Sequence, residues 1–274
     1  MSRFAHFPTP RRRLLIVSLV AFLSLAGTCL GPLIVSDGKE QELGVSIAQE
    51  VEANPEFHLL GDAEVDAYIT ELSLKVIEAS PRQRDFPFSF KVVINPEINA
   101  FALPGGYCYV HTGLIQAAES ESELVGVIAH EVSHVTCGHH RNMIANQFVV
   151  DTAQGVLVPE NSAIIGAAAN VVSGVGLLKF SRSQEAQADD VGADAMWRAG
   201  WDPRGLKDFF EKLREMEGRD PGRVEMLFRS HPATGDRVEA LEALAQSFPP
   251  RDDLISDTPR FHFIQARVND LLGQ

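Results

Sequence analysis

Basic residues and cysteines are both scarce in this chain. Lysine and arginine together number 24 against 37 aspartates and glutamates, which gives a formal net charge of −13 at pH 7 over 274 residues. Nucleic acid and anionic lipid surfaces repel so acidic a protein, so we expect no nucleic-acid partner. The sequence also lacks internal repeats, coiled-coil heptads and low-complexity tracts, and its hydrophobic content of 45% is ordinary for a globular protein.

The three cysteines are Cys29, Cys108 and Cys137. None of them has the paired C-x-x-C spacing of a structural zinc site. Cys108 and Cys137 can form a disulfide in an oxidising compartment, or they can remain two small buried thiols. The sequence leaves both options open.

One short motif carries most of the chemical information in the chain. An H-E-x-x-H motif, in a stretch patterned as a helix, is formed by His130-Glu131-Val132-Ser133-His134. The two imidazoles share one helix face and can bind one metal ion, for which Zn²⁺ with three protein ligands is the expected choice. Glu131 is then suited to accept a proton from the attacking water of a metallopeptidase. A solvated surface helix is the alternative, but the apolar residues at 124–129 disfavour it, because buried polar groups require partners.

A zinc site needs a third ligand, and the stretch 181–190 offers one. It is rich in Gln, Glu and Ala and opens with Ser181, a residue suited to an N-cap, so we expect a helix. Glu185 and Asp189 are four residues apart on one face. Glu185 can ligate the metal, and Asp189 can accept the free N–H of a zinc-bound histidine and fix its tautomer. An acidic helix surface is the ordinary alternative.

Together these motifs resemble a known family. H-E-x-x-H followed by R-x-x-E-x-x-A-D (182–189) is similar to the zinc metallopeptidase family named for the CAAX prenyl proteases, and within it to the soluble bacterial periplasmic branch of the beta-barrel assembly-enhancing proteases. The resemblance runs from about residue 40 to the C-terminus and includes N-A-F-A-L-P-G-G (99–106) and H-P-x-x-x-x-R (231–237). It implies an α+β, mostly helical, zincin-like domain with one Zn²⁺ per chain, polypeptide substrates, and a small sheet whose edge strand flanks the H-E-x-x-H helix.

The resemblance also implies roles for two residues of the H-P-x-x-x-x-R segment. The histidine that matches His231 lies near the zinc in relatives, so His231 either assists catalysis beside Glu131 or occupies the fourth zinc position in a silent resting state. A packing histidine before a proline is the ordinary alternative. Arg237 is expected to brace the site through a salt bridge rather than to contact substrate.

Two further histidines follow the motif. Relatives often have a basic residue and then a histidine at this point, whereas here Gly138 precedes His139 and His140. His139 is five residues from His134, so we expect it to point to a different face of the helix. We therefore predict that neither His139 nor His140 is a metal ligand.

A strand before the H-E-x-x-H helix is expected to bind substrate, as in relatives. Residues 106–111 are rich in β-formers and could form an edge strand that pairs with an extended peptide. Gly105 and Gly106 would allow close approach of the substrate backbone, and Ala102 completes the predicted substrate-binding set. An ordinary strand with a glycine turn is the alternative.

The N-terminus has the pattern of an export signal. Arg11, Arg12 and Arg13 precede an uncharged apolar run at 14–35. A cleaved signal peptide, a lipoprotein signal ending at Cys29, and a single membrane anchor are all compatible with this run, and all three place the rest of the chain outside the cytoplasm. We therefore expect residues 1–35 to be a signal or anchor, with possible membrane association, and residues 36–274 to be a metallopeptidase domain in the periplasm or on the periplasmic face of a bacterial membrane.

The sequence thus predicts a zinc endopeptidase acting on misfolded or unassembled envelope proteins. A chaperone-like or self-inhibited zinc-binding protein of envelope quality control is the alternative, and the oligomeric state stays open. Helices are expected at 40–52, 62–79, from about 120 through the motif, and at 203–217, 235–246 and 260–272, with a strand at 88–94. The apolar stretch 163–178 is interpreted as a helix packing beside the zinc site, or else as a lid or a membrane-contacting surface.

Overall fold

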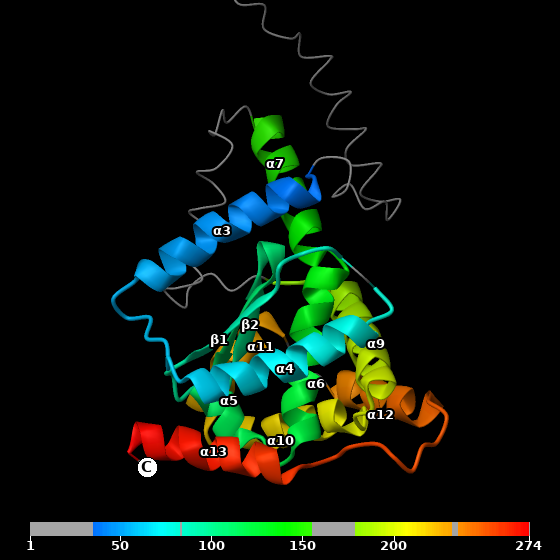
Figure 1. Ribbon diagram of the computed structural model, residues 1–274. Helices are drawn as coiled ribbons and strands as arrows, with labels where there is room; N and C mark the ends of the chain where they lie inside the picture. The colour runs from blue at the N-terminus through cyan, green and yellow to red at the C-terminus, as the bar shows by residue number, and fades with distance from the viewer. Residues whose placement is uncertain (1–34, 83, 155–178, 232–234, 274) are drawn as a thin grey trace, which may run out of the picture.

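Helices surround a small sheet in this protein. The computed structural model describes residues 35–82, 84–154, 179–231 and 235–273. In that part of the chain, helix α6 (Glu121–Thr136) runs through the middle of the fold, and helix α3 (Asp37–Ala53) lies across the sheet (Figure 1). The mostly helical α+β architecture predicted from the sequence is confirmed.

Among the described residues, the sheet has three strands in the order β1-β3-β2. Strand β1 (Ser89–Val93) pairs in parallel with β3 (Tyr107–His111), and β2 (Ala100–Leu103) pairs antiparallel with β3. The prediction that 106–111 forms the edge strand is therefore wrong, because β3 is central and β2 is the edge strand beside α6. The short 3-10 turn η1 (Pro104–Gly106) reverses the chain after β2, and this hairpin brings β3 to the inside of the sheet.

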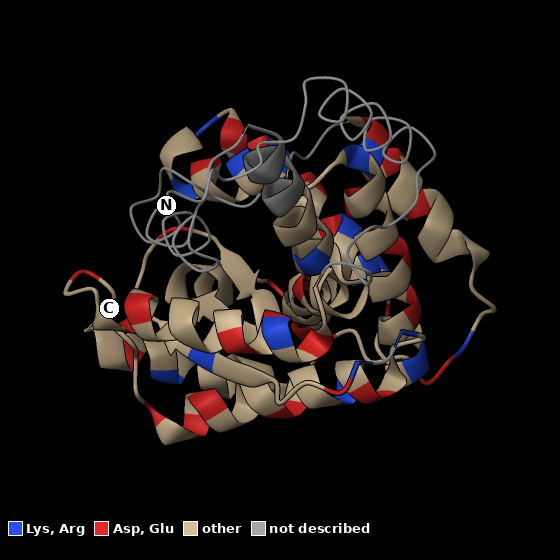
Figure 2. Cartoon of the chain, turned by 90° about the horizontal axis from the view of Figure 1, so that it is seen from above, with Lys and Arg blue, Asp and Glu red and all other residues tan. Residues whose placement is uncertain are grey.

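The two faces of the sheet contact different helices. Successive side chains of a strand point to opposite faces, so Cys108 and Val110 face the main core with α6, while Tyr109 packs with α3. Helix α3 comes very close to η1, because a Cβ on Gly44 would lie 2.0 Å from the carbonyl oxygen of Pro104. The N-terminal end of α3 is also held by an ion pair of 2.8 Å between Glu40 and Arg84. Acidic and basic residues are interspersed along the helices in the view of Figure 2.

Helix α6 is enclosed on all sides. Each of its residues is buried, and it contacts β2, α4 (Ala63–Ala79), α9 (Arg182–Ala199) and α10 (Arg204–Glu217). Its polar side chains are therefore removed from water and require partners within the protein.

A glycine lets α9 cross α6 closely at the point where the motif begins. A Cβ on Gly192 would lie 3.2 Å from the backbone nitrogen of His130 and 3.2 Å from the carbonyl oxygen of Ala129. Contacts this tight leave little room for a side chain at position 192. The close crossing brings the N-terminal turns of α9 alongside the histidines of α6.

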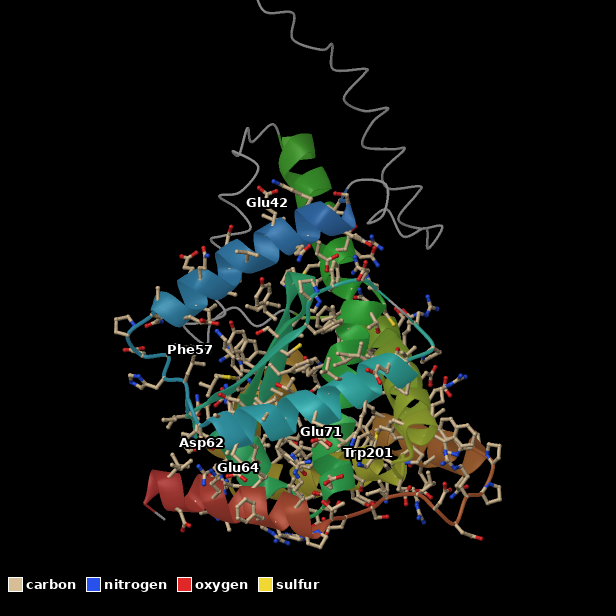
Figure 3. The ribbon with its side chains drawn as sticks, in the orientation of Figure 1. Glu42, Phe57, Asp62, Glu64, Glu71 and Trp201 are labelled. Atoms are coloured by element: carbon tan, nitrogen blue, oxygen red, sulfur yellow. The ribbon has the colours of Figure 1, made fainter. Side chains whose placement is uncertain are left out.

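A buried carboxylate ties the N-terminal end of α6 to three other segments. Glu121 accepts hydrogen bonds from the Tyr68 hydroxyl at 2.8 Å, from Trp201 Nε1 at 2.8 Å, and from the Thr258 hydroxyl. Figure 3 shows Trp201 beside this end of α6. Thr258 also caps α13 (Pro259–Leu272), so the last helix is fastened to α6 through the same carboxylate.

The predicted helix starts are confirmed at three positions. Asp62 caps α4, Ser120 caps α6, and Ser181 caps α9 with Gln184 completing a capping box. Asp62 also accepts two hydrogen bonds, at 2.8 and 2.7 Å, from Arg267 of α13. Figure 3 shows Asp62 at the start of α4, just above α13.

The remaining helices are α5 (Thr112–Ala117), α7 (His139–Gln154), α11 (Pro221–Ser230) and α12 (Gly235–Ser247). The helices predicted at 203–217, 235–246 and 260–272 agree with α10, α12 and α13 to within one residue at each end. Helices α5, α7 and α11 had not been predicted.

Some of the sequence predictions concern residues that the structure does not describe. The segments 1–34 and 155–178 are outside the described residues, and with them all but the last residue of the predicted signal or anchor (1–35) and the whole of the apolar stretch 163–178. Cys108 and Cys137 are free thiols rather than a disulfide. In the part of the chain that is described, no helix is long and apolar enough to cross a membrane.

Candidate active site

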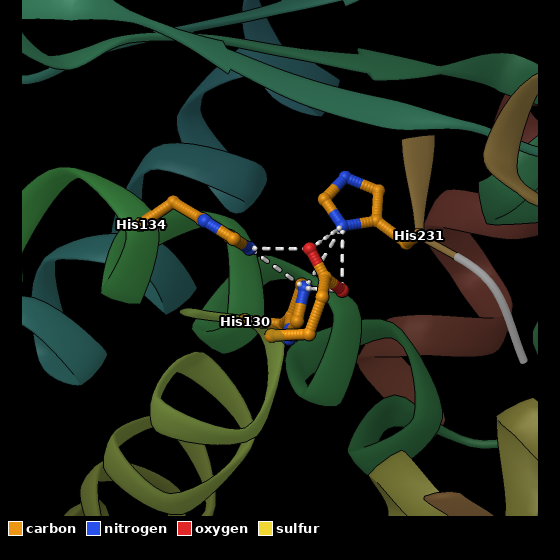
Figure 4. A group of neighbouring side chains, drawn as sticks. His130, His134 and His231 are labelled. Atoms are coloured by element: carbon orange, nitrogen blue, oxygen red, sulfur yellow. Dashed lines mark hydrogen bonds and ion pairs between the residues drawn. The ribbon is translucent and has the colours of Figure 1, made fainter. Parts of the chain in front are cut away.

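Four buried side chains from three helical segments converge at one point. His130, His134, Glu185 and His231 each offer one ligand atom, and these atoms all lie within 4.8 Å of one another (Figure 4). We call these four residues the His–Glu cluster. All four are among the site residues that the sequence predicts.

The two histidines of α6 lie one helical turn apart and point the same way. Their Nε2 atoms are 3.0 Å apart. Glu185 lies in the first turn of α9, and its carboxylate oxygens are 3.5 Å from Nε2 of His130 and 3.5 Å from Nε2 of His134. The close crossing of α9 over α6 produces this approach.

His130 is oriented by a carboxylate and an arginine. Its Nδ1 lies 2.9 Å from Asp189, which can only accept a hydrogen bond, so Nδ1 carries a proton and Nε2 is the nitrogen directed at the cluster. Arg237 holds Asp189 with two hydrogen bonds of 2.8 and 2.7 Å and reaches Glu185 at 3.0 Å. The guanidinium also lies over the ring of Phe210, 4.1 Å from its centroid.

His231 is the C-cap residue of α11 and lies inside the cluster. Its Nδ1 is 3.1 Å from both carboxylate oxygens of Glu185 and 3.2 Å from Nε2 of His130. Its other nitrogen, Nε2, is 3.3 Å from Oε1 of Glu131. One ring therefore connects Glu131 to the other members of the cluster.

Glu131 is buried beside the edge strand. It accepts a hydrogen bond from the backbone N–H of Ala102, while its Oε1 forms no hydrogen bond with any group that the structure describes. Burial disfavours the charged carboxylate and raises the pKa of Glu131. A carboxylate with a raised pKa and an oxygen that forms no hydrogen bond is suited to take up a proton.

The electrostatics of the cluster favour a cation. Burial opposes a charge on His130, but hydrogen bonds to the Asp189 and Glu185 carboxylates outweigh it and raise the pKa of His130 to about 9. Burial likewise opposes the charge on Glu185, yet its bonds to His130 and His231 hold the pKa of that carboxyl below the usual range. The same negative charge that attracts a proton to His130 also attracts a metal ion.

The donor set fits zinc. Imidazole nitrogen and carboxylate oxygen are the ligand types of catalytic zinc sites, which use three protein ligands. His130, His134 and Glu185 supply that set, and Nε2 of His130 lies 3.0 Å from Nε2 of His134 and 3.5 Å from Glu185. These residues could therefore hold a metal ion, with His231 as a fourth possible ligand.

The two further histidines lie outside the cluster but touch the site. His140 Nε2 donates to the carbonyl oxygen of Ala102 at 2.9 Å. His139 contacts Nδ1 of His134 at 2.9 Å, so the prediction that it points to a different face is wrong. Gly138 explains the difference, because its positive φ of 72° interrupts the helix after α6, and a separate helix, α7, begins at His139.

The residues predicted to bind substrate are not all near the cluster. Ala102 lies on the edge strand, next to Glu131. Gly105 and Gly106 are buried and do not border the cluster: a Cβ on Gly105 would meet Gln41 of α3 at 3.0 Å, and one on Gly106 would meet Phe88 at 3.2 Å. Both have positive φ, so they shape the turn between β2 and β3.

Sequence reasoning missed two neighbours of the site. The ring of Phe180 stacks on that of His134, with centroids 3.8 Å apart, and Gln187 of α9 contacts His139 at 2.9 Å. Phe180 lies directly before the α9 cap, and Gln187 lies between Glu185 and Asp189, so their closeness to the predicted ligands was the available signal.

The chain is similar to metalloproteases of bacteria. The model of peptidase family M48 matches residues 62–245. The beta-barrel assembly-enhancing protease of Escherichia coli (strain K12) is 28% identical over 252 residues, covering 88% of this chain and 50% of the relative. A putative beta-barrel assembly-enhancing protease of Vibrio cholerae is 30% identical over 77% of this chain and 45% of the relative.

A shorter relative is also similar. The metalloprotease LoiP of Escherichia coli (strain K12) is 34% identical over 160 residues, covering 56% of this chain and 61% of the relative. The chain spans about half the length of the beta-barrel assembly-enhancing proteases it matches. The family match includes the α6 histidines, the α9 carboxylates and the segment from His231 to Arg237, and the chain therefore belongs to peptidase family M48.

Proposed function

We propose that this chain is a zinc-dependent endopeptidase that hydrolyses peptide bonds in misfolded or unassembled envelope proteins. The observation that carries the proposal is the arrangement of Glu131: a buried carboxylate, whose Oε1 forms no hydrogen bond with any described group and lies 3.3 Å from Nε2 of His231, is placed beside a cluster of three potential metal ligands and that further histidine. His130, His134 and Glu185 hold one zinc ion in this proposal.

The bound ion supplies Lewis-acid chemistry, which polarises a carbonyl group and lowers the pKa of water. The chain's own residues move the proton that the attacking water gives up. Glu131 accepts a proton at Oε1 and delivers it to the nitrogen of the leaving amine, which is the role expected of a buried carboxylate with a raised pKa. Burial of Glu131 keeps this carboxylate oriented, and before substrate binds the hydrogen bond from Ala102 holds it as well.

Asp189 and Arg237 are proposed as positioning residues. Asp189 keeps the proton of His130 on Nδ1 and so leaves Nε2 available. Arg237 compensates the charges of Asp189 and Glu185, which would otherwise repel one another in a buried site.

His231 is proposed to complete the ligand set in a resting state. Its Nδ1 is directed at Glu185 and His130 rather than at open space, which supports this role over direct assistance to the reaction. The two roles predict opposite effects of removing the ring. Cleavage by a His231→Ala variant should rise if His231 restrains the enzyme and fall if it assists.

Strand β2 is proposed to bind an extended substrate. Its outer edge pairs with no other strand in the part of the chain that the structure describes, yet the N–H of Ala102 bonds Glu131 and its C=O accepts from His140. A substrate that adds to β2 at Ala102 must replace these two bonds. Gly105 and Gly106, beneath α3, are proposed to shape the strand turn rather than to contact substrate.

The location and substrates are proposed from the N-terminal sequence and the relatives. The basic and apolar N-terminal segment has the pattern of an export signal, and relatives bear the name beta-barrel assembly-enhancing protease. Both support a site of action in the bacterial envelope, on polypeptide substrates.

The test compares the parent protein with Glu131→Gln. Glutamine keeps the acceptor for the Ala102 N–H but cannot take up the proton. We expect one zinc per chain in both proteins and cleavage of an unfolded protein such as casein by the parent alone. Equal cleavage by both proteins would remove Glu131 from the mechanism, and zinc in both without cleavage in either would favour a self-inhibited or chaperone-like protein.

A further inference from the structure

His139 is buried between a predicted metal ligand and a side chain of α9. It is 1% exposed, its Nδ1 lies 2.9 Å from Nδ1 of His134, and its Nε2 lies 2.9 Å from Oε1 of Gln187. It is not a member of the His–Glu cluster. The left-handed turn at Gly138 brings it to this position, as α7 begins.

The direction of each hydrogen bond follows from the chemistry of Gln187. A carbonyl oxygen of an amide can only accept, so His139 donates from Nε2. Neither hydrogen-bond partner of His139 is charged, and a neutral imidazole carries one N–H, so its Nδ1 is an acceptor. His134 must therefore donate from its own Nδ1, which leaves the lone pair of its Nε2 pointing at Glu185 and His130.

We propose that Gln187 and His139 form a positioning pair that fixes the tautomer and ring orientation of His134 for metal binding. The proposal rests on the proposed zinc site. A rotation of the His134 ring by half a turn would direct a carbon instead of Nδ1 at His139 and would turn Nε2 away from the cluster. The stacked ring of Phe180 covers one face of His134 and leaves less space for such a rotation.

The two ligand histidines of α6 are thus oriented by different chemistry. His130 donates to a carboxylate, Asp189, whereas His134 donates to a neutral imidazole. Both supports come from α9, because Gln187 and Asp189 lie two residues apart on that helix and Glu185 is itself a predicted ligand. Helix α9 therefore supplies one ligand and supports the other two. The support of His134, through Gln187 and His139, adds no negative charge to the site.

The test measures the release of zinc to a chelator from the full chain. His139→Leu removes the acceptor and should speed zinc release or weaken zinc affinity by about 10- to 100-fold, the range found when such supporting residues are lost. His139→Asn places an amide oxygen near the position of Nδ1 and should recover most of the loss. Gln187→Leu should weaken zinc binding less than His139→Leu. Without Gln187, His139 populates both of its tautomers, and one of them still accepts the hydrogen bond from Nδ1 of His134.

A matched control is available one residue away. His140 is also buried, at 1% exposed, and lies on the same helix, but it bonds the Ala102 carbonyl and no ligand. Zinc release from His140→Leu should match that of the parent. Equal losses in His139→Leu and His140→Leu would attribute the effect to general damage to α7 and would overturn the proposal.

A spectroscopic readout separates positioning from packing. In the zinc-free parent, imidazole ¹⁵N shifts should show His134 protonated at Nδ1, and in Gln187→Leu and His139→Leu part of the population should move to the Nε2–H form. An unchanged His134 tautomer in both variants would overturn the proposal even if zinc were lost. The proposed function fails separately, if the parent itself holds no zinc or cleaves nothing.

Discussion

Removal of the buried guanidinium of Arg237 should destabilise the protein most strongly when no metal is bound. Arg237 is 9% exposed and lies within 3.0 Å of carboxylate oxygens of both Asp189 and Glu185. Arg237→Met keeps much of the apolar stem and its packing against Phe210 but leaves the two carboxylates without this partner. Breaking a buried pair in this way costs about 3 to 5 kcal/mol.

The assay is urea unfolding followed by circular dichroism at pH 7, with EDTA or with zinc in excess. In EDTA we expect Arg237→Met to lose about 3 to 5 kcal/mol, which corresponds to a melting temperature lower by roughly 10 °C for a domain of this size. In zinc the loss should be smaller, because a cation at Glu185 replaces part of the missing positive charge.

The control is Arg198→Met on α9. Arg198 pairs with Asp194 at 2.9 Å, but its side chain is 53% exposed, and pairs of this kind contribute at most about 0.5 kcal/mol. A loss below about 1 kcal/mol for Arg237→Met in EDTA would refute the reasoning. A loss of the same size with and without zinc would show that the guanidinium does not act on the charge of the cluster.

Three further predictions concern other parts of the chain. Glu121→Leu leaves two buried donors and the part-buried Thr258 hydroxyl without their acceptor and should cost roughly 3 kcal/mol, measured by urea unfolding; full stability would show that this carboxylate does not hold α13 against α6. Hydrogen bonds from Arg267 lower the pKa of Asp62 to about 2, so its contribution of about 1 kcal/mol is present above pH 4 and is lost as the pH falls through 2; the stability of Asp62→Asn should converge with that of the parent over that window. His231→Ala should retain zinc and cleave casein faster than the parent, and slower cleavage would instead assign His231 a direct part in the reaction.

Local patterns in the sequence were sufficient to single out His130, His134, Glu185 and Asp189, whereas His231 and Arg237 were indicated by the family resemblance. The four-residue spacing of His130 and His134, and that of Glu185 and Asp189, places each pair on one helix face, and the structure brings the two helix faces together. The caps at Ser120 and Ser181 depend on hydrogen bonds within three residues, so they too can be predicted from the sequence.

Features that depend on distant segments were not predictable in the same way. Which strand lies at the edge depends on β1 pairing with β3, and no local pattern in 106–111 indicates that partner. The return of His139 to His134 depends on one backbone angle at Gly138. The burial of Gly105 depends on α3, which begins more than 60 residues earlier in the chain.

The central claim is that His130, His134 and Glu185 form one metal centre. Anomalous diffraction at the zinc edge, from crystals of the zinc-loaded Glu131→Gln protein, tests it most directly. We predict one peak per chain, about 2.0 to 2.2 Å from a nitrogen of each histidine and from an oxygen of Glu185. A peak held by His139 or His140 instead, or no peak inside the His–Glu cluster, would contradict the account.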